Sequence, residues 1–289
     1  MYEFWILITA SLVASSCALV GSLLILRRMS MLGDAISHSV LLGIVLVYVI
    51  FQHTHLHWML AGAVLVGVMT AWLSQWIHQK ARVPVDASLG LVFTWLFALA
   101  VVLIAVYAEH VHLDHEHVLF GEMAFIPFNP LIIDGQNYGP QAFWLASLVL
   151  MLNLLVILVG FERFKLTSFH PTLAASLGIN VVIWHYLLMT LVSITAVASF
   201  DLVGSILVVA LLVIPASTAY LLAKSLKQML WLALAYAQAA VFIGFALAYW
   251  LDSALSASMG VAAGCLLFAT LLIQKLFRRQ QNTAVLTHH

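Results

Sequence analysis

The chain is a succession of apolar runs, each about as long as a bilayer is thick. A helix needs about 20 apolar residues to cross the hydrocarbon core, because it rises only about 1.5 Å per residue. Since 64% of the residues are hydrophobic and only 8% are charged, a soluble domain is excluded. We predict an all-α fold, a polytopic membrane helical bundle of about nine transmembrane helices within a range of about eight to ten. The expected spans are 4–26, 34–51, 58–78, 89–108, 141–161, 181–199, 202–223, 229–250 and 257–277. The weakest boundaries are at 199–203, where Asp201 alone interrupts the apolar sequence, and at the start of the second run.

The basic residues between these runs predict the orientation. With nine spans, all eleven Lys and Arg residues fall on the same side of the membrane, which is the cytoplasmic side by the positive-inside rule. We therefore expect the N-terminus outside, the C-terminus in the cytoplasm and a short cytoplasmic tail at 278–289. The whole chain, residues 1–289, then forms a single transmembrane domain in the lipid bilayer. A bacterial plasma (inner) membrane is the expected location.

Several function classes are excluded by what the chain lacks. It has no GxxxxGK[ST] phosphate loop, no HExxH pair and no GxSxG elbow, so it carries none of these catalytic motifs. Its formal net charge is zero, which gives no bulk attraction to nucleic acid. Its two cysteines, Cys17 and Cys265, lie far apart and suggest neither a disulfide framework nor a thiolate metal site. A membrane chain of this kind is most often a transporter or channel subunit rather than an enzyme.

Asp34 and His38 lie at the start of the second apolar run, four residues apart. On a helix this spacing places both side chains on one face. A carboxylate oxygen with an imidazole nitrogen suits Mn²⁺, Fe²⁺ or Zn²⁺. In the alternative interpretation, Asp34 caps the helix beside Gly33 and His38 is a hydrogen-bonded interior residue. Because ionisable side chains within a membrane are usually functional, this pair is the candidate metal site.

The expected outer loop at 109–140 is rich in histidine and acidic residues in its first part, 109–129. Such a composition attracts divalent cations electrostatically, although loops are polar for backbone reasons alone. The loop is therefore either an ordinary wet surface loop or a site of metal capture. The candidate capture residues are His112, Asp114, His115 and His117.

Two further segments have the pattern of moving or docking parts. At 162–180 the longest cytoplasmic segment mixes charges with apolar residues, and Pro171 and Gly178 mark the start and end of a short helix. This segment is either a plain linker or a helix that docks onto a cytoplasmic partner. In the run 202–223, Pro215 removes one helical hydrogen bond and predicts a kink, which serves either packing or a gate.

Four stretches occur in a characteristic order along the chain. They are RRMSMLGDAISHSVLLGI (27–44), HLDHEHVLFGE (112–122), FKLTSFHPTLAASLGI (164–179) and DLVGSILVVALLVIPASTAYLLA (201–223). Together they resemble the membrane permease subunit of ATP-binding-cassette importers for manganese, zinc or iron, the ABC-3 type of metal permease. The resemblance covers essentially the whole chain.

This resemblance implies an ATP-driven importer of a divalent transition metal that works by alternating access. Two permease chains, identical or related, would pair in the bilayer, with two copies of a cytoplasmic ATP-binding subunit below and an extracytoplasmic metal-binding protein above. No cofactor would be bound permanently, because Mn, Fe or Zn is the transported ion. In such permeases the motif aspartate and histidine, here Asp34 and His38, line the path and bind the ion. The positions implied for ATPase coupling are Glu162, Phe164, Phe169, Pro171 and Gly178.

The resemblance also implies a particular depth for the candidate metal site. Counted from Arg27 and Arg28, Asp34 lies near the cytoplasmic edge, since a helix rises only about 1.5 Å per residue. The family places this site deeper in the membrane. Either residues 29–33 therefore form a break inside the membrane region, or the span boundaries are shifted. We favour a break around Gly33, since irregular backbone is permitted where it lines a cavity.

The alternative function is a stand-alone, proton-coupled secondary transporter of divalent metals. It would need no ATPase, but it would need several acidic or histidine residues on facing helices to relay protons. Besides Asp34 and His38, the candidates are His185, Asp201 and Asp252, most of which lie near the ends of spans.

Overall fold

The structure is a computed structural model that describes residues 2–51, 56–107, 123–133 and 136–286. Its long helices are α1 (Tyr2–Leu26), α2 (Leu32–Phe51), α3 (Leu56–Ala81), α4 (Val85–Tyr107), α6 (Gln141–Phe169), α8 (Val181–Val203), α9 (Ser205–Leu222), α10 (Leu226–Leu251) and α11 (Leu255–Leu286). The shorter elements are a 3₁₀ helix η1 (Met123–Phe128), strands β1 (Pro130–Ile133) and β2 (Gln136–Pro140), and helix α7 (Pro171–Ser176). Within the described residues, nine helices are long and apolar enough to cross a membrane. This number confirms the predicted helical bundle.

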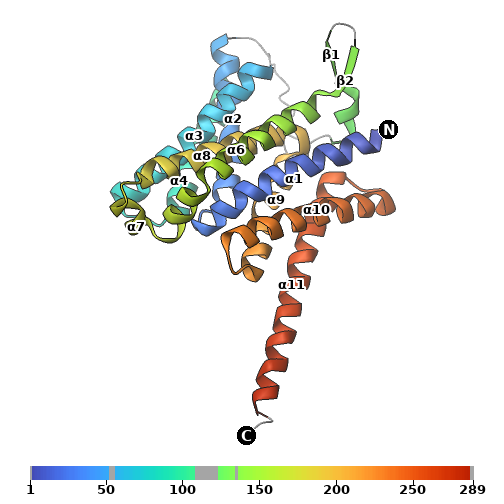
Figure 1. The fold of residues 1–289 in the computed structure, drawn as a ribbon. Coiled ribbons are helices and arrows are strands. Elements are labelled where there is room, and N and C mark those ends of the chain that lie inside the picture. The colour runs from blue at the N-terminus through green and yellow to red at the C-terminus, as the bar shows by residue number, and fades with distance from the viewer. Residues whose placement is uncertain (1, 52–55, 108–122, 134–135, 287–289) are drawn as a thin grey trace.

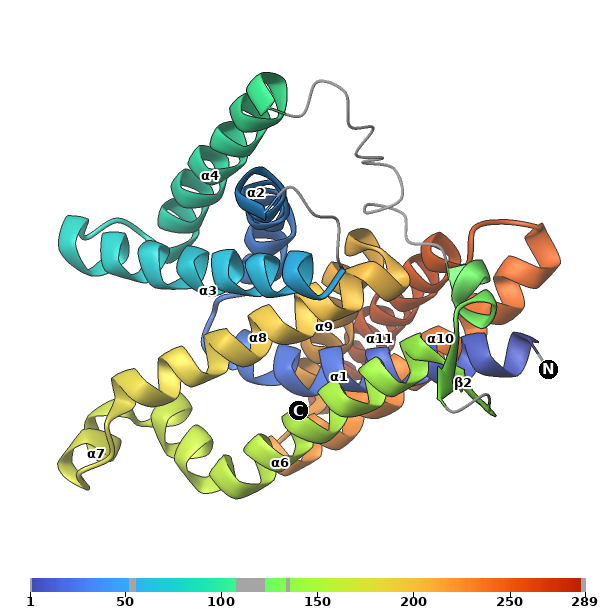
Figure 2. The ribbon, with the colours of Figure 1, turned by 90° about the horizontal axis from the view of Figure 1, so that it is seen from above.

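The bundle has two distinct ends. Helices α1, α6 and α8 run side by side, with the N-terminus and the β1–β2 hairpin at one end and α7 at the other (Figures 1 and 2). Helix α1 is central, since it packs against α6, α8, α9 and α10. Helices α2, α3 and α4 pack on one another and share a small apolar cluster of their own. The metal-site candidates on α2 therefore lie where this three-helix group joins the main bundle.

The chain reverses between α1 and α2 through a hydrogen-bonded turn. The N–H of Met29 donates to the Leu24 carbonyl at 3.2 Å, and that of Arg28 donates to the Ile25 carbonyl at 3.0 Å. This is a Schellman motif, in which the residue after the helix adopts the left-handed conformation. Arg28 has a φ of 56°. The chain thus breaks at 27–31, which overlaps the expected range 29–33, whereas Gly33 itself is helical inside α2.

The boundary between α8 and α9 also differs from the prediction. Asp201 does not interrupt α8, which continues to Val203. The chain turns at Gly204, whose φ of 83° and ψ of 151° lie in a region that is essentially restricted to glycine. A single glycine therefore separates two spans, because only it adopts this backbone conformation without strain.

Leu212 of α9 is the meeting point of three helices. A Cβ on Gly21 of α1 would collide with the carbonyl of Leu212, and a Cβ on Gly33 of α2 would lie 3.0 Å from its Cδ1. Helices in a membrane gain little from hydrophobic association, so small residues that allow close backbone approach hold them together. Gly21 and Gly33 thus bring α1 and α2 to the same level of α9.

The β1–β2 hairpin lies in the segment predicted to be an outer loop. The strands pair antiparallel, with Ile132 opposite Asn137, and a bulge lies between Pro130 and Ile132. The indole of Trp144 donates to the Tyr138 carbonyl at 3.1 Å, which ties the hairpin to the start of α6. This small sheet is the one departure of the described chain from an all-helical fold.

The C-terminal segment expected to be a short tail, 278–289, is helical as far as Leu286. Helix α11 continues to Leu286 without a break at 277. Its second half projects away from the rest of the bundle (Figure 1). The charged residues after the apolar run therefore extend the helix, since Arg and Gln are good helix formers.

The Gly21–Leu212 approach yields a stability prediction. Replacing Gly21 by Ala inserts a methyl group against the backbone of α9, which should cost at least about 1–3 kcal/mol of unfolding free energy. The measurement is the thermal unfolding midpoint of the purified protein in detergent micelles. Gly264→Ala in α11 is the matched control, because its Cβ would meet nothing within 4 Å. An equal midpoint for the two variants would contradict the contact.

Candidate functional site

Asp34 and His38 form a close pair in the first two turns of α2. The Nε2 atom of His38 lies 3.6 Å from Oδ1 of Asp34. Their side chains are 45% and 43% exposed in this single chain. The predicted i, i+4 arrangement on one helical face is therefore confirmed, and both side chains are partly exposed on the surface of this single chain.

Two aromatic rings of α4 hold the imidazole in place. His38 stacks on Phe93 with ring centroids 5.5 Å apart, and the edge of Phe97 approaches it at 6.0 Å. These contacts restrict the rotation of the ring and leave its Nε2 beside the carboxylate. This support was not predicted from the sequence, although Phe93 and Phe97 have the i, i+4 spacing that places two side chains on one helical face.

The pair has the chemistry of a partial metal site. Carboxylate and imidazole are both ligands of first-row transition metals. Asp34 lies in the first turn of α2, where the helix dipole favours a negative charge. Among the described residues, no third His, Cys, Asp or Glu joins them in a cluster. One chain thus offers two ligands, and any further ligands must come from water or another chain.

The depth of the pair within the bundle follows from Leu212. Gly33, next to Asp34, and Gly21 both lie against Leu212, which is close to the middle of α9. From Gly21, α1 runs on for about 9 Å to Arg27, at about 1.5 Å per residue. The chain then reverses and returns to the level of Leu212. Asp34 is therefore well separated in depth from Arg27, although it is close in sequence.

The three other titratable candidates lie at the ends of helices or in other contacts. His185, near the start of α8, is hydrogen-bonded to Arg27. Asp201 is in the last turn of α8 and is exposed. Asp252 ends α10 with a left-handed backbone. Within the described residues they build no relay cluster with Asp34 and His38.

Helix α7 has the boundaries that the sequence predicted. Pro171 is its first residue, and Gly178 follows its end with a φ of 78°. The N–H of Ile179 donates to the Ala174 carbonyl at 3.0 Å, and that of Gly178 donates to the Ala175 carbonyl at 3.1 Å. This is a second Schellman motif, and glycine occupies its left-handed position.

The surface of α7 and its flanks is apolar and exposed. Phe169, Leu173 and Leu177 are 49%, 48% and 63% exposed. Glu162 is also exposed, and its carboxylate lies 3.5 Å from the Lys165 ammonium. The segment thus exposes three apolar side chains at and around α7, and its docking role stays a prediction.

Phe164 differs from the other expected docking residues. It is fully buried, and its ring meets the edge of Trp184 at a centroid distance of 4.9 Å. The guanidinium of Arg27 lies 6.0 Å above the same ring. The expected direct coupling role for Phe164 is therefore corrected: it packs α6 against α8 and has no surface left for a partner.

The remaining candidates fall in two groups. Helix α9 contains Pro215 as an internal, buried residue and continues through it to Leu222, so its role as a kink or gate stays a prediction. The four candidates for outer-loop metal capture lie outside the described residues. They are His112, Asp114, His115 and His117.

The chain is similar to known transport proteins along nearly its whole length. The sequence model of the ABC 3 transport family matches residues 1–274. The manganese transport system membrane protein MntD of Bacillus subtilis is 45% identical over 263 residues, which cover 91% of this chain and 89% of that protein. The zinc transport system membrane protein TroD of Treponema pallidum is 38% identical over 261 residues, which cover 90% of this chain and 71% of that protein.

A solved structure agrees with the sequence matches. PsaBC from Streptococcus pneumoniae in complex with Fab superposes with a TM-score of 0.75 at 31% identity, covering 93% of this chain and 91% of that chain. The fold, the spans and the sequence matches thus point to one group of proteins. The chain is a multi-pass membrane transport protein and belongs to the ABC 3 transport family.

Proposed function

We propose that this chain is the permease subunit of an ATP-driven importer for a divalent transition metal, manganese, iron or zinc. The observation that carries the proposal is the Asp34–His38 pair, which opens outward from the bundle at 3.6 Å separation. Relatives that bear the names of manganese and zinc transport proteins support the substrate class. This chain would carry the ion, and hydrolysis of ATP would take place on a separate subunit.

The partial ligand set supports pairing with a second permease chain. Two ligands hold a metal ion weakly, and two chains facing each other would supply about four, a normal number for a transition metal. Binding must remain weak enough for release on the other side of the membrane. A second copy or a related permease, in contact across the exposed face of α2, would complete such a site.

The two ends of the bundle suit two different partners. The end with α7 carries basic residues, including Arg27, Arg28 and Lys165, and we assign it to the cytoplasm by the positive-inside rule. There, two ATP-binding subunits would dock on the α7 segments of the two permeases. The hairpin end would face outside, together with the N-terminus, and would receive the metal from an extracytoplasmic binding protein. The C-terminus would then be cytoplasmic.

The metal-site assignment is tested by alanine substitution. Asp34→Ala and His38→Ala should each reduce metal uptake by at least about tenfold, since even residues that only support a ligand cost 10–100-fold. The measurement is uptake of radioactive Mn²⁺ into proteoliposomes that contain the assembled transporter and ATP. Thr94→Ala on the exposed face of α4, beside Phe93, is the control and should transport normally. Normal metal uptake by an assembled Asp34→Ala transporter would contradict the assignment of Asp34 as a metal ligand.

The same proteoliposomes distinguish the importer from a proton-coupled secondary transporter. We expect no uptake from the permease alone when a pH gradient is imposed, and uptake when the ATPase subunit and ATP are present inside. Metal uptake by the permease alone, driven by the gradient, would overturn the importer assignment.

The docking role of α7 is tested by a charge in its apolar surface. Leu173→Asp should weaken binding of the ATPase subunit by about thirtyfold, which corresponds to the loss of a central interface residue worth about 2 kcal/mol. The measurement is the amount of ATPase that co-purifies with the permease. Ile132→Asp is the matched control, because Ile132 is an exposed apolar residue of the hairpin at the opposite end. Equal recovery of ATPase with both variants would refute the docking role.

A further inference from the structure

A polar cavity lies where the ends of four helices meet near α7. It has a volume of about 370 Å³ and lies between the ends of α1, α3, α6 and α8. Arg27 and Arg28 contribute two positive charges to its lining, and Gln75 and Gln79 contribute amides. None of the residues that line it is acidic. The cavity is therefore cationic, with no negative charge of its own.

Arg27 is held in this cavity by neutral partners only. Its Nη2 donates to Thr167 Oγ1 at 2.9 Å and its Nε donates to Ser168 Oγ at 3.3 Å. Its Nη1 lies 3.4 Å from the Trp184 carbonyl and 3.3 Å from Nδ1 of His185. Burial lowers the pKa of this guanidinium to about 10, so it stays charged at neutral pH. Buried charges are normally paired with an opposite charge, and among the described residues Arg27 has no carboxylate partner.

His185 supplies a second unsatisfied group in the same lining. An arginine can only donate hydrogen bonds, so the Nδ1 that faces Arg27 must accept one. The ring proton is thereby assigned to Nε2. That atom is buried and has no hydrogen-bond partner among the described residues. Because this nitrogen is buried, the cavity offers a ligand chiefly its two cations, Arg27 and Arg28, which favour an anion rich in hydrogen-bond acceptors.

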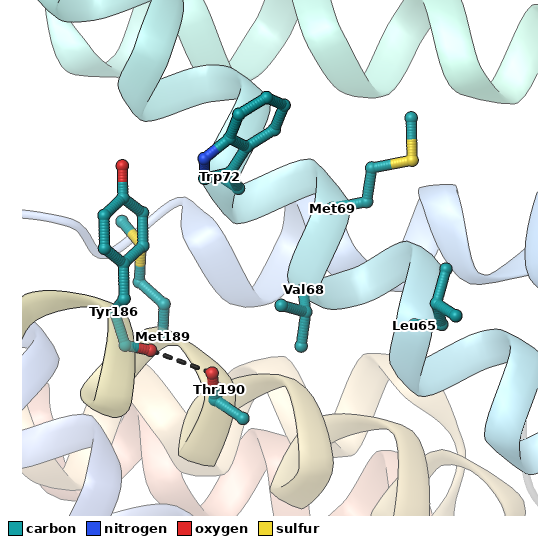
Figure 3. Close-up of a pocket in the computed structure, with 7 residues that line it drawn as sticks. All are labelled: Leu65, Val68, Met69, Trp72, Tyr186, Met189 and Thr190. Carbon is teal, nitrogen blue, oxygen red and sulfur yellow. Dashed lines mark hydrogen bonds between the residues drawn. The ribbon is translucent and has the colours of Figure 1, made fainter. Parts of the chain in front are cut away.

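An apolar groove continues from this cavity between α3 and α8. It has a volume of about 470 Å³, and Tyr186 lines both the groove and the cavity. Its lining comes from α3, with Leu65, Val68, Met69 and Trp72, and from α8, with Tyr186, Met189 and Thr190 (Figure 3). The one hydroxyl in this lining besides Tyr186, that of Thr190, is satisfied by the Tyr186 carbonyl at 2.9 Å.

The groove and the cavity together have the length and polarity of a phospholipid. The lining of α3 runs from Leu65 to Gln79, about 21 Å along the helix. Half of the hydrocarbon core is about 15 Å thick, which leaves room for a headgroup at the Gln79 end. An acyl chain fits the apolar part, and a phosphate fits the charged part.

We propose that the cavity at Arg27 and Arg28 and the groove between α3 and α8 form one binding site for an anionic phospholipid. The phosphate lies between the two arginines, and an acyl chain follows the groove past Trp72 toward Leu65. Placement in the cytoplasmic leaflet rests on the orientation given under the proposed function. The binding chemistry does not depend on it, so lipid binding and metal transport can fail independently.

The test compares lipids on the purified, fully assembled transporter. Equal, limiting amounts of phosphatidylglycerol and phosphatidylcholine are added, and native mass spectrometry counts the lipids that remain bound. Phosphatidylglycerol should be retained preferentially. Arg28→Gly should reduce that preference about fivefold, the effect of one basic residue on binding to an anionic lipid. This variant folds, because glycine adopts the left-handed conformation of residue 28 without strain.

Two further variants separate the charge from the groove. Lys224→Gln removes an exposed charge outside the cavity and should leave the preference unchanged. Val68→Phe narrows the groove and should weaken the binding of both lipids while ATPase recovery stays normal. Millimolar inorganic phosphate should not displace the lipid.

Four results would overturn the proposal. They are equal retention of the two lipids, an equal loss of preference in Arg28→Gly and Lys224→Gln, displacement by inorganic phosphate, and disulfide cross-linking of Val68→Cys to a cysteine on the second permease chain. Displacement by phosphate would show a site for a free anion. Cross-linking would show that a permease partner, not lipid, fills the groove.

Discussion

The close approach of α1 and α2 to Leu212 of α9 is the contact on which the rest of the site depends. Two glycines, Gly21 and Gly33, allow it, since a side chain at either position would meet α9. In a bilayer, helices associate through such packing and not through hydrophobic transfer. With both helices held at one level, the connection at 27–31 must run to the end of the bundle and back. Asp34 is thereby placed near the level of Leu212, away from the end of the bundle where Arg27 lies.

Arg27 joins this connection to the docking segment. It directly precedes the turn into α2, and it is hydrogen-bonded to the end of α6 and to the start of α8. These are the two helices that flank α7. The hydrogen bonds of Arg27 therefore link the segment expected to bind the ATPase with the turn that leads into the helix of Asp34.

The same arrangement explains why the two ends of the bundle differ in chemistry. Both Schellman turns, at Arg28 and Gly178, lie at the α7 end. Basic side chains gather there beside exposed apolar ones, whereas the hairpin end closes through aromatic contacts such as that of Tyr2 with Phe128 at 5.6 Å. The exposed basic and apolar side chains of the α7 end suit contact with a soluble protein and with lipid headgroups.

Local patterns in the sequence predicted those features that depend on neighbouring residues. The nine spans follow from runs of apolar residues, and the ends of α7 follow from Pro171 and Gly178, whose backbone preferences act within one turn. The i, i+4 spacing likewise placed Asp34 and His38 on one face. The prediction at Asp201 failed because a single exposed charge at a helix end is tolerated, while the turn needed the backbone of Gly204.

The sequence by itself thus determined the membrane class, the span count and the common helical face of Asp34 and His38, because each rests on the length of apolar runs or on spacing along one helix. The tertiary structure decided what those residues face. It placed Phe93 and Phe97 around His38, buried Phe164 and located the chain break at Arg28 in place of Gly33. These outcomes depend on which helices pack together, and such packing between distant segments is not written into any local pattern.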